Sequence, residues 1–411
     1  MFDLYACTIM EKNIQTMADH LLKLVIFLVV LMNTHQVHGD QPDKEINITL
    51  VTDATAKGAV CNDGSSAAYY YSPGFGEGVN NWLVHLTGGA WCSDDNSCFN
   101  RLHMSVGSST HNAKTVTFRS MKSSNQTLNP DLYNWNKVHI VYCDSSSFMG
   151  LTDHPKIASR GARIFEAIMD ELLQKGMACA TNAMLSGSSA GGLAAILHCD
   201  GFRAFLPESS RVKCVSDSGF FIHAPKLHGA EITANAFANV AAYHGFTNKL
   251  PSSCTSRMNA SLCIFPEYIV KDIKTPLFLV ETKFDQLQMP SRYVKDGGRF
   301  TKSCIANLTL CTPSDLLSMK DYGMAVTGLL QEIRNSSSIG MFVHPCLRHG
   351  HFFEKFGWRS SYKLKNKTIA QAVGDWFYDR DVSFQEIDMD HEYPLTCRQY
   401  SSKYIMPNVF I

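Results

Sequence analysis

The stretch Leu185-Ser186-Gly187-Ser188-Ser189-Ala190-Gly191-Gly192-Leu193 says most about the fold. It contains the pattern Gly-x-Ser-x-Gly with Ser189 at its centre. This pattern is typical of a nucleophile elbow, where a serine occupies a strained turn between a strand and a helix and the glycines avoid clashes of Cβ atoms. The flanks agree, because a short strand-like run at 182–185 precedes the motif and a helix-forming run at 193–197 follows it. Ser189 is therefore the candidate nucleophile.

Strand and helix patterns alternate on both sides of this motif. Apolar, β-prone runs predict strands at 82–86, 138–142, 212–215, 276–280 and 341–343. Apolar residues at helical spacing predict helices over 162–173 and 369–377. The alternation predicts an α/β fold, with a mostly parallel central sheet and helices on both faces. We expect one domain over 40–411, in which 40–60 is an opening segment and the Ser/Asn/Thr-rich stretch 105–130 is a surface insertion.

A serine nucleophile needs a general base, an acid that orients the base, and donors for an oxyanion. In elbow-type sites these partners follow in the order Ser, acid, His. Asp285 and His349 each follow a predicted strand, at the edge of the sheet where sites form in open α/β folds. His344 and His351 are close rivals, and spacing alone does not separate them from His349.

The oxyanion donors should combine the amide after the nucleophile, which is that of Ala190, with amides of an early glycine-rich loop. The loop Thr87-Gly88-Gly89-Ala90-Trp91 ends the predicted strand 82–86 and fits this role. An ordinary turn between a strand and a helix would have the same composition. The elbow at Ser189 favours the catalytic interpretation.

Composition and charge exclude some functions. Hydrophobic residues make up 45% and charged residues 18% of the 411 residues, which is typical of a folded globular protein. Lys and Arg number 37, as do Asp and Glu. This balance gives no support for nucleic-acid binding, which usually requires a basic excess.

The N-terminal region resembles a secretory signal. The apolar run Leu24–Met32 follows Lys23 and is shorter than the roughly 20 residues of a membrane span, and Val37-His38-Gly39 offers small residues for cleavage. We expect a signal peptide over 1–39 and no stable membrane anchor; the alternative is an uncleaved signal-anchor. Glycosylation sequons follow at Asn47, Asn125, Asn259, Asn307, Asn335 and Asn366. The sequence thus predicts a secreted, extracellular protein.

The cysteines agree with secretion. Of 14 cysteines, Cys7 precedes the expected cleavage site, and the others show neither a CxxC pair nor Cys/His spacing for zinc. We therefore expect disulfides and no metal. Plausible local bridges are Cys92/Cys98, Cys254/Cys263 and Cys304/Cys311. The odd number after cleavage predicts at least one thiol that is free or paired outside the chain.

Several separated blocks together match the pattern of a known family. They are KGAVCNDG (57–64), NNWLVHL (80–86), GGAWC (88–92), NPDLYNWN (129–136), YCD (142–144), RGARIF (160–165), GSSAGG (187–192), LHCD (197–200), PSSC (251–254) and VGDW (373–376). With these blocks the chain resembles the pectin acetylesterases, in the α/β-hydrolase-related group that also includes the Notum carboxylesterases. The resemblance covers nearly the whole chain after residue 40. It implies an α/β-hydrolase-like fold and serine chemistry without a cofactor.

The resemblance also assigns the site residues. It implies Ser189 as nucleophile, Asp285 as acid and His349 as base, with oxyanion donors on the backbone of Gly89, Ala90 and Ala190. Two positions depart from the family pattern, because Ser188 and Gly350 stand where relatives carry cysteine. If those cysteines pair in relatives, a bridge near the site is absent here, and we expect a less rigid site.

The expected function is a secreted, monomeric serine carboxylesterase that removes acetyl groups from pectic polysaccharides in the cell wall. Arg348 is a candidate contact for such a polyanionic substrate, although an ordinary solvated arginine would look the same. One alternative is a Notum-like deacylase of a lipid-modified protein, which would need a deep apolar pocket. Another is a catalytically silent glycan-binding protein, which the intact Ser189, Asp285 and His349 disfavour.

Overall fold

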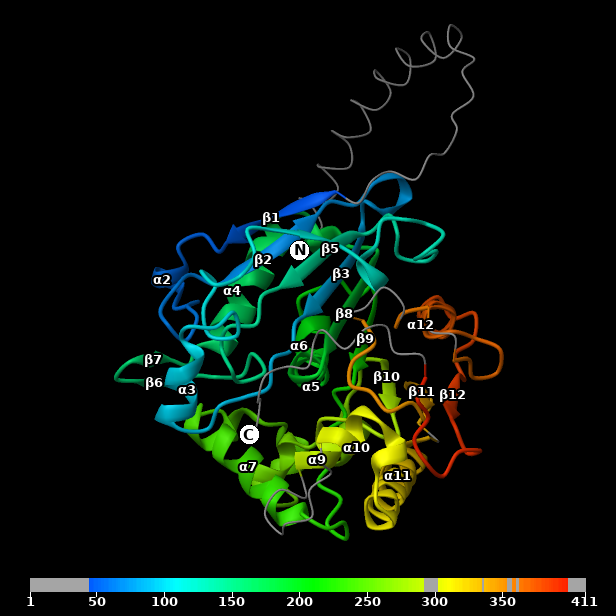
Figure 1. Ribbon diagram of the computed structural model, residues 1–411. Coiled ribbons are helices and arrows are strands. Elements are labelled where there is room, and N and C mark those ends of the chain that lie inside the picture. Colours follow the sequence, from blue (N-terminus) through cyan, green and yellow to red (C-terminus); the bar gives the residue numbers. More distant parts are fainter. Residues whose placement is uncertain (1–43, 292–301, 335, 353–356, 360–361, 398–411) are drawn as a thin grey trace, which may run out of the picture.

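The computed structural model describes residues 44–291, 302–334, 336–352, 357–359 and 362–397 (Figure 1). The signal peptide expected over 1–39 lies outside these residues. Ten strands form the main sheet: β1 (Glu45–Leu50), β2 (Ala68–Ser72), β3 (Asn81–Leu86), β4 (Thr115–Thr117), β5 (Asn136–Ile140), β8 (Asn182–Ser188), β9 (Arg211–Asp217), β10 (Leu277–Thr282), β11 (Ile339–His344) and β12 (Gln385–Ile387). A separate ribbon consists of β6 (Asp153–His154) and β7 (Ile157–Ala158).

The order across the sheet is β12-β11-β10-β9-β8-β3-β5-β2-β1-β4. Neighbouring strands from β12 to β5 run parallel. The remaining strands are antiparallel, with β2 on β5, β1 on β2 and β4 on β1. The expected mostly parallel α/β sheet is thus confirmed, and the architecture is consistent with an α/β-hydrolase.

Helices cover both faces of the sheet. Along β10 the residues Leu277 and Leu279 join one buried apolar cluster, whereas Phe278 and Val280 join another, because successive strand side chains point to opposite faces. The helices are α2 (Ala54–Lys57), α3 (Asp95–Arg101), α4 (Gly161–Gln174), α5 (Ala190–Leu197), α6 (Cys199–Ala204), α7 (Ala230–Tyr243), α8 (Ser252–Thr255), α9 (Gln288–Ser291), α10 (Lys302–Ala306), α11 (Pro313–Ile333) and α12 (Ile369–Phe377). Helices α4 and α5 supply residues to the first cluster, and α12 to the second.

Short 3-10 turns connect many of these elements. They are Gly76–Gly78, Ser120–Lys122, Met177–Cys179, Thr247–Lys249, Ala260–Ile264, Pro266–Tyr268, Val270–Asp272 and Leu308–Leu310. No helix within the described ranges has the length and apolar character needed to cross a membrane.

Every strand and helix expected from the sequence is present, with ends that differ by a few residues. The opening segment 40–60, for which no strand was predicted, contains β1, a strand of the main sheet. One expectation was wrong. The supposed surface insertion 105–130 contributes β4 to the same sheet and buries Met121 fully in the core. The edge strand β4 has only three residues, too few for an alternating pattern to identify it. Strand β1 does alternate polar and apolar residues over Glu45–Leu50, and this alternation was the available signal for it.

Six disulfides are described, and the three expected local bridges are confirmed among them. The others join Cys61 to Cys143, Cys199 to Cys214 and Cys346 to Cys397. Cys179 is disulfide-bonded as well, outside these six bridges, so the described residues contain no free cysteine. The odd cysteine expected after cleavage at residue 39 stays a prediction. This many disulfides is typical of a protein of the secretory pathway.

Candidate active site

Ser189 lies in a sharp turn between β8 and α5, as the motif predicts. Its φ of 59° and ψ of −127° are rare for a residue with a Cβ atom. Glycines make this turn possible, because a Cβ atom on Gly187 would lie 2.0 Å from the carbonyl oxygen of Gly191. The amide of Ser189 donates to the carbonyl oxygen of Asp217 at 2.8 Å. The strained serine is therefore held from the neighbouring strand β9.

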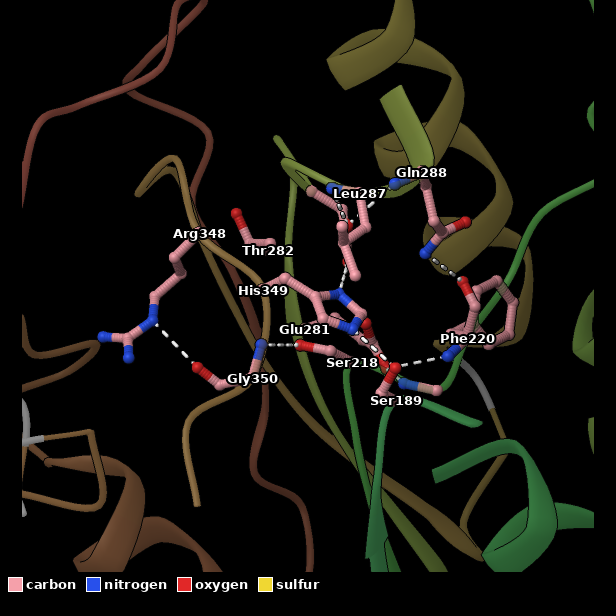
Figure 2. A network of polar contacts seen from close by, with 12 residues as sticks. Ser189, Ser218, Phe220, Glu281, Thr282, Leu287, Gln288, Arg348, His349 and Gly350 are labelled. Atoms are coloured by element: carbon pink, nitrogen blue, oxygen red, sulfur yellow. Dashed lines mark hydrogen bonds and ion pairs between the residues drawn. The ribbon is translucent and has the colours of Figure 1, made fainter. Parts of the chain in front are cut away.

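Ser189, His349 and Asp285 form a chain of hydrogen bonds. Figure 2 labels Ser189 and His349. The Nε2 atom of His349 lies 2.7 Å from Oγ of Ser189, and its Nδ1 atom lies 2.7 Å from Oδ2 of Asp285. The other carboxylate oxygen, Oδ1, accepts the amides of Leu287 at 2.8 Å and Gln288 at 3.0 Å. Ser189 is 5% and Asp285 1% exposed. The backbone amides of Leu287 and Gln288 thus hold the Asp285 carboxylate in place, and the carboxylate orients the imidazole of His349.

The three candidate histidines occupy different environments. Only His349 hydrogen-bonds to Ser189 among the described side chains. His344 and His351 contact each other through their Nε2 atoms at 2.5 Å, and His351 bonds to Asp217 through Nδ1. The two rivals therefore belong to a separate buried network.

The electrostatics at His349 favour its protonated form. Burial alone would lower the pKa of this imidazole, but the adjacent Asp285 carboxylate and the more distant Asp217 outweigh burial and raise the pKa above its ordinary value. Arg348 acts in the opposite direction. A base with a raised pKa accepts a proton readily, which suits proton transfer from a serine hydroxyl.

The loop of Gly89 and Ala90 lies against Ser189. A Cβ atom on the preceding Gly88 would lie 2.7 Å from Cβ of Ser189. Ala90 has a positive φ of 54°. The N–H groups of Gly89, Ala90 and Ala190 donate to no acceptor in the described part of the chain, so all three are available to a ligand oxygen.

Two side chains that the sequence did not reveal hold this loop by its carbonyl groups. The hydroxyl of Tyr142 donates to the carbonyl oxygen of Ala90 at 2.6 Å, and the buried guanidinium of Arg101 donates to that of Gly89. Tyr142 belongs to the block 142–144 that carried the family resemblance. That block was the available signal, although nothing in it showed which loop the tyrosine would contact.

Ser188 and Gly350, which stand in place of family cysteines, are both tied to the end of β9. Oγ of Ser188 donates to Oδ2 of Asp217 at 2.7 Å. The amide of Gly350 donates to Oγ of Ser218 at 2.9 Å. Noncovalent bonds thus connect these two positions, and the sequence had not singled out Asp217 even though it follows a predicted strand.

Aromatic side chains crowd the space beside the site. Trp91 packs against Phe221 and Phe237, with ring centroids 4.9 Å apart in each pair, and Phe221 lies 6.4 Å from the His349 ring. These three aromatic residues are buried. Arg348, which the sequence offered only as a candidate substrate contact, uses its Nε atom to donate to the carbonyl oxygen of Gly350 at 3.0 Å.

One cluster of metal-ligating residue types occurs in the described ranges, at Cys92, Cys98 and His244. The two cysteines form a disulfide with each other. Because thiolates and not disulfides bind metal ions, this cluster does not fit a metal, and the chemistry of the Ser189 site calls for none.

With the site described, comparison with known proteins defines the family. Residues 40–400 match the pectinacetylesterase family. The chain belongs to this family. It is 42% identical over 352 residues to pectin acetylesterase 7 of Arabidopsis thaliana, covering 84% of this chain and 90% of that protein. Pectin acetylesterase 11 of the same plant is 41% identical, with the same coverage. The resemblance inferred from the sequence blocks is confirmed.

This pectinacetylesterase family member is also related to the Notum carboxylesterases. It is 27% identical over 361 residues to the mouse palmitoleoyl-protein carboxylesterase NOTUM. The aligned region covers 84% of this chain and 66% of that protein. The family is one of carboxylesterases, and catalytic activity is implied by membership.

Proposed function

We propose that this protein is a serine esterase in which Ser189 is the nucleophile, His349 the general base and Asp285 the acid that orients the base. The observation that carries the proposal is the Asp285–His349–Ser189 chain, with 2.7 Å at each step. This is the arrangement that activates a serine hydroxyl at neutral pH.

The reaction would proceed through an acyl-enzyme. Oγ of Ser189 attacks the ester carbonyl carbon while Nε2 of His349 takes the hydroxyl proton, and Asp285 stabilises the imidazolium through Nδ1–H. His349 then gives its proton to the departing sugar hydroxyl. Water, deprotonated by His349, attacks the acyl-enzyme, releases acetate and restores Ser189.

The amides of Gly89, Ala90 and Ala190 would bind the oxyanion of each tetrahedral intermediate. Each such donor contributes on the order of 3 kcal/mol to the transition state. Support comes from their N–H groups, which donate to no acceptor among the described residues, and from the carbonyl contacts of Tyr142 and Arg101, which orient the loop.

The substrate would be an acetylated pectic polysaccharide. The identity of 42% to a pectin acetylesterase exceeds the identity of 27% to mouse NOTUM. Buried Phe221 lies beside the His349 ring and packs against Trp91, which in turn packs against Phe237; rings that fill this side of the base suit a small acyl group better than a long chain.

We further propose that the chain carries a signal peptide over 1–39, followed by one domain over 40–411, and acts as a monomer outside the cell, in the cell wall. The disulfides support passage through an oxidising compartment. Four sequons are exposed and open to glycosylation, at Asn47, Asn259, Asn307 and Asn366.

The test is acetate release from acetylated pectin by the secreted protein, together with hydrolysis of aryl acetate and of an aryl ester with a long acyl chain. Ser189→Ala should abolish release, whereas Ser186→Ala, which removes a buried hydroxyl from the same strand, should retain it. Cleavage of only the long-chain ester would replace pectin by a lipid-modified substrate. Inactivity of the folded protein on all three esters would refute the esterase and favour a binding protein.

A further inference from the structure

Asp217 lies at the carboxyl end of β9 and is fully buried. Its main-chain carbonyl oxygen accepts the amide of Ser189 at 2.8 Å. Its side-chain oxygen Oδ2 accepts the hydroxyl of Ser188 at 2.7 Å and the amides of His351 at 2.8 Å and Phe352 at 3.0 Å. One residue thus holds both the nucleophile turn and the segment that follows the base His349.

The second carboxylate oxygen, Oδ1, is bound by a chain of two histidines. The amide of Cys346 donates to Nδ1 of His344 at 3.0 Å, so the proton of that ring is on Nε2. This proton is directed at Nε2 of His351, 2.5 Å away, so the proton of His351 is on Nδ1 and is donated to Asp217. The hydrogen bonds therefore fix both histidines as neutral tautomers and Asp217 as a carboxylate.

The electrostatics agree with this assignment. Burial lowers the pKa of both His344 and His351. Burial alone would raise the pKa of Asp217, but its interactions with His351 and Ser188 outweigh burial and lower it. The network carries one buried negative charge.

We propose that Asp217 is a positioning residue for the reaction, which couples the nucleophile turn to the histidine loop and so sets the Ser189–His349 distance. The inference rests on the proposed serine chemistry and extends it to a residue that touches no reacting atom. Gly350, between His349 and His351, is held by Ser218, the residue after Asp217 (Figure 2). The end of β9 thus contacts the loop at three consecutive residues beyond the base.

An asparagine at 217 would disturb the whole network. Whichever way the amide turned, its NH₂ group would face N–H or O–H donors, because both carboxylate oxygens accept. If the NH₂ group faced His351, it would donate to Nδ1 of that ring, and the ring proton would have to lie on Nε2. That proton would then point at the Nε2 proton of His344. The histidine loop would then shift relative to Ser189, and a displacement of about 1 Å costs on the order of 100-fold in rate.

The test measures the rate at which a fluorophosphonate labels Ser189, and kcat and KM on aryl acetate, across pH. Asp217→Asn should lower the labelling rate and kcat on the order of 100-fold with KM nearly unchanged. It should also move the acid limb of the pH profile to lower pH. The charged groups that face His349 are Asp285, Asp217 and Arg348, and this variant removes one of the two anions that raise its pKa.

Two further variants separate positioning from general core damage. Ser188→Ala removes a single donor to Asp217 and keeps the charge, so kcat should fall about tenfold without a shift of the acid limb. His85→Gln alters an equally buried side chain that bonds to Ser186 on the same strand, and it should stay within about twofold of the unmodified protein.

The outcomes are distinct. Wild-type protein that the probe does not label at Ser189 would refute both the serine chemistry and this proposal. Labelled wild type with Asp217→Asn reacting at the same rate, or with an unmoved acid limb, would refute the positioning role alone. If Asp217→Asn does not fold, Ser188→Ala decides, and wild-type kinetics in that variant would overturn the proposal.

Discussion

Replacement of Asp285 by asparagine should nearly abolish esterase activity, and the structure indicates why. In the native site Oδ1 of Asp285 accepts two backbone amides, those of Leu287 and Gln288, while Oδ2 faces Nδ1 of His349. The single oxygen of asparagine would remain with the two amides. Its NH₂ group would then face Nδ1 and hold the imidazole proton on Nε2, where it cannot accept the proton of Ser189.

The size of the loss in kcat follows from the free energy needed to turn the asparagine amide the other way. The productive tautomer would require the asparagine amide to flip, which leaves two buried N–H groups unpaired at about 1–3 kcal/mol each. The total of about 2–6 kcal/mol corresponds to a loss of about 30-fold to 25,000-fold, at about 1.36 kcal/mol per factor of ten. We expect about 10³-fold in kcat on aryl acetate, near the middle of that range on a logarithmic scale.

Glu281 offers a matched control. One of its oxygens, Oε1, also accepts two backbone amides, those of Gly219 and Phe220, at 3.0 Å each. Burial raises the pKa of this carboxyl group well above its ordinary value. Glu281→Gln keeps an oxygen for both amides, so kcat should stay within about threefold of wild type. Wild-type kcat in folded Asp285→Asn, or an equal loss in Glu281→Gln, would refute the tautomer argument.

Three more predictions concern pH and packing. Protonated His349 cannot act as a base, and the pKa of this imidazole is raised above its ordinary value near 6.5. We therefore expect kcat/KM to fall as pH drops through a value above 6.5. An acid limb centred below 6.5 would contradict this. His244 is buried, and burial lowers its pKa to about 4. The neutral side chain therefore contributes fully to the stability of the folded protein above the unfolded pKa near 6.5, and this contribution is lost as pH falls toward 4. The loss should reach about 2–3 kcal/mol near pH 4.5. Urea unfolding of His244→Gln should show a correspondingly smaller loss, and identical pH dependences would exclude this role. Gly191→Ala should lower the free energy of unfolding by about 3 kcal/mol or more in a thermal unfolding assay, because its Cβ atom would lie 2.2 Å from the carbonyl oxygen of Leu86. Gly201→Ala in α6, where the added Cβ atom meets open space, should be neutral or slightly stabilising. Equal effects of the two substitutions would argue against the close approach at Gly191.

Local sequence determined the elements that position the site. The turn at Ser189 depends on residues within a few positions of it, because the positive φ and the close backbone contacts need glycines at fixed offsets. The same holds for Cys254 and Cys263, whose short separation lets the disulfide form within one local segment. The buried parallel strands were equally visible, since their apolar runs are continuous.

Other features depended on residues far apart in the chain. The sequence left His344, His349 and His351 equivalent by spacing, because the contact with Ser189 joins residues 160 positions apart. Asp217 escaped notice for the same reason, since its partners at Ser188 and His351 come together only through strand order and the loop after β11. Composition and periodicity report which residues are buried. Which polar groups then meet is decided by how the strand ends align at one edge of the sheet, and that alignment exists only in the tertiary structure.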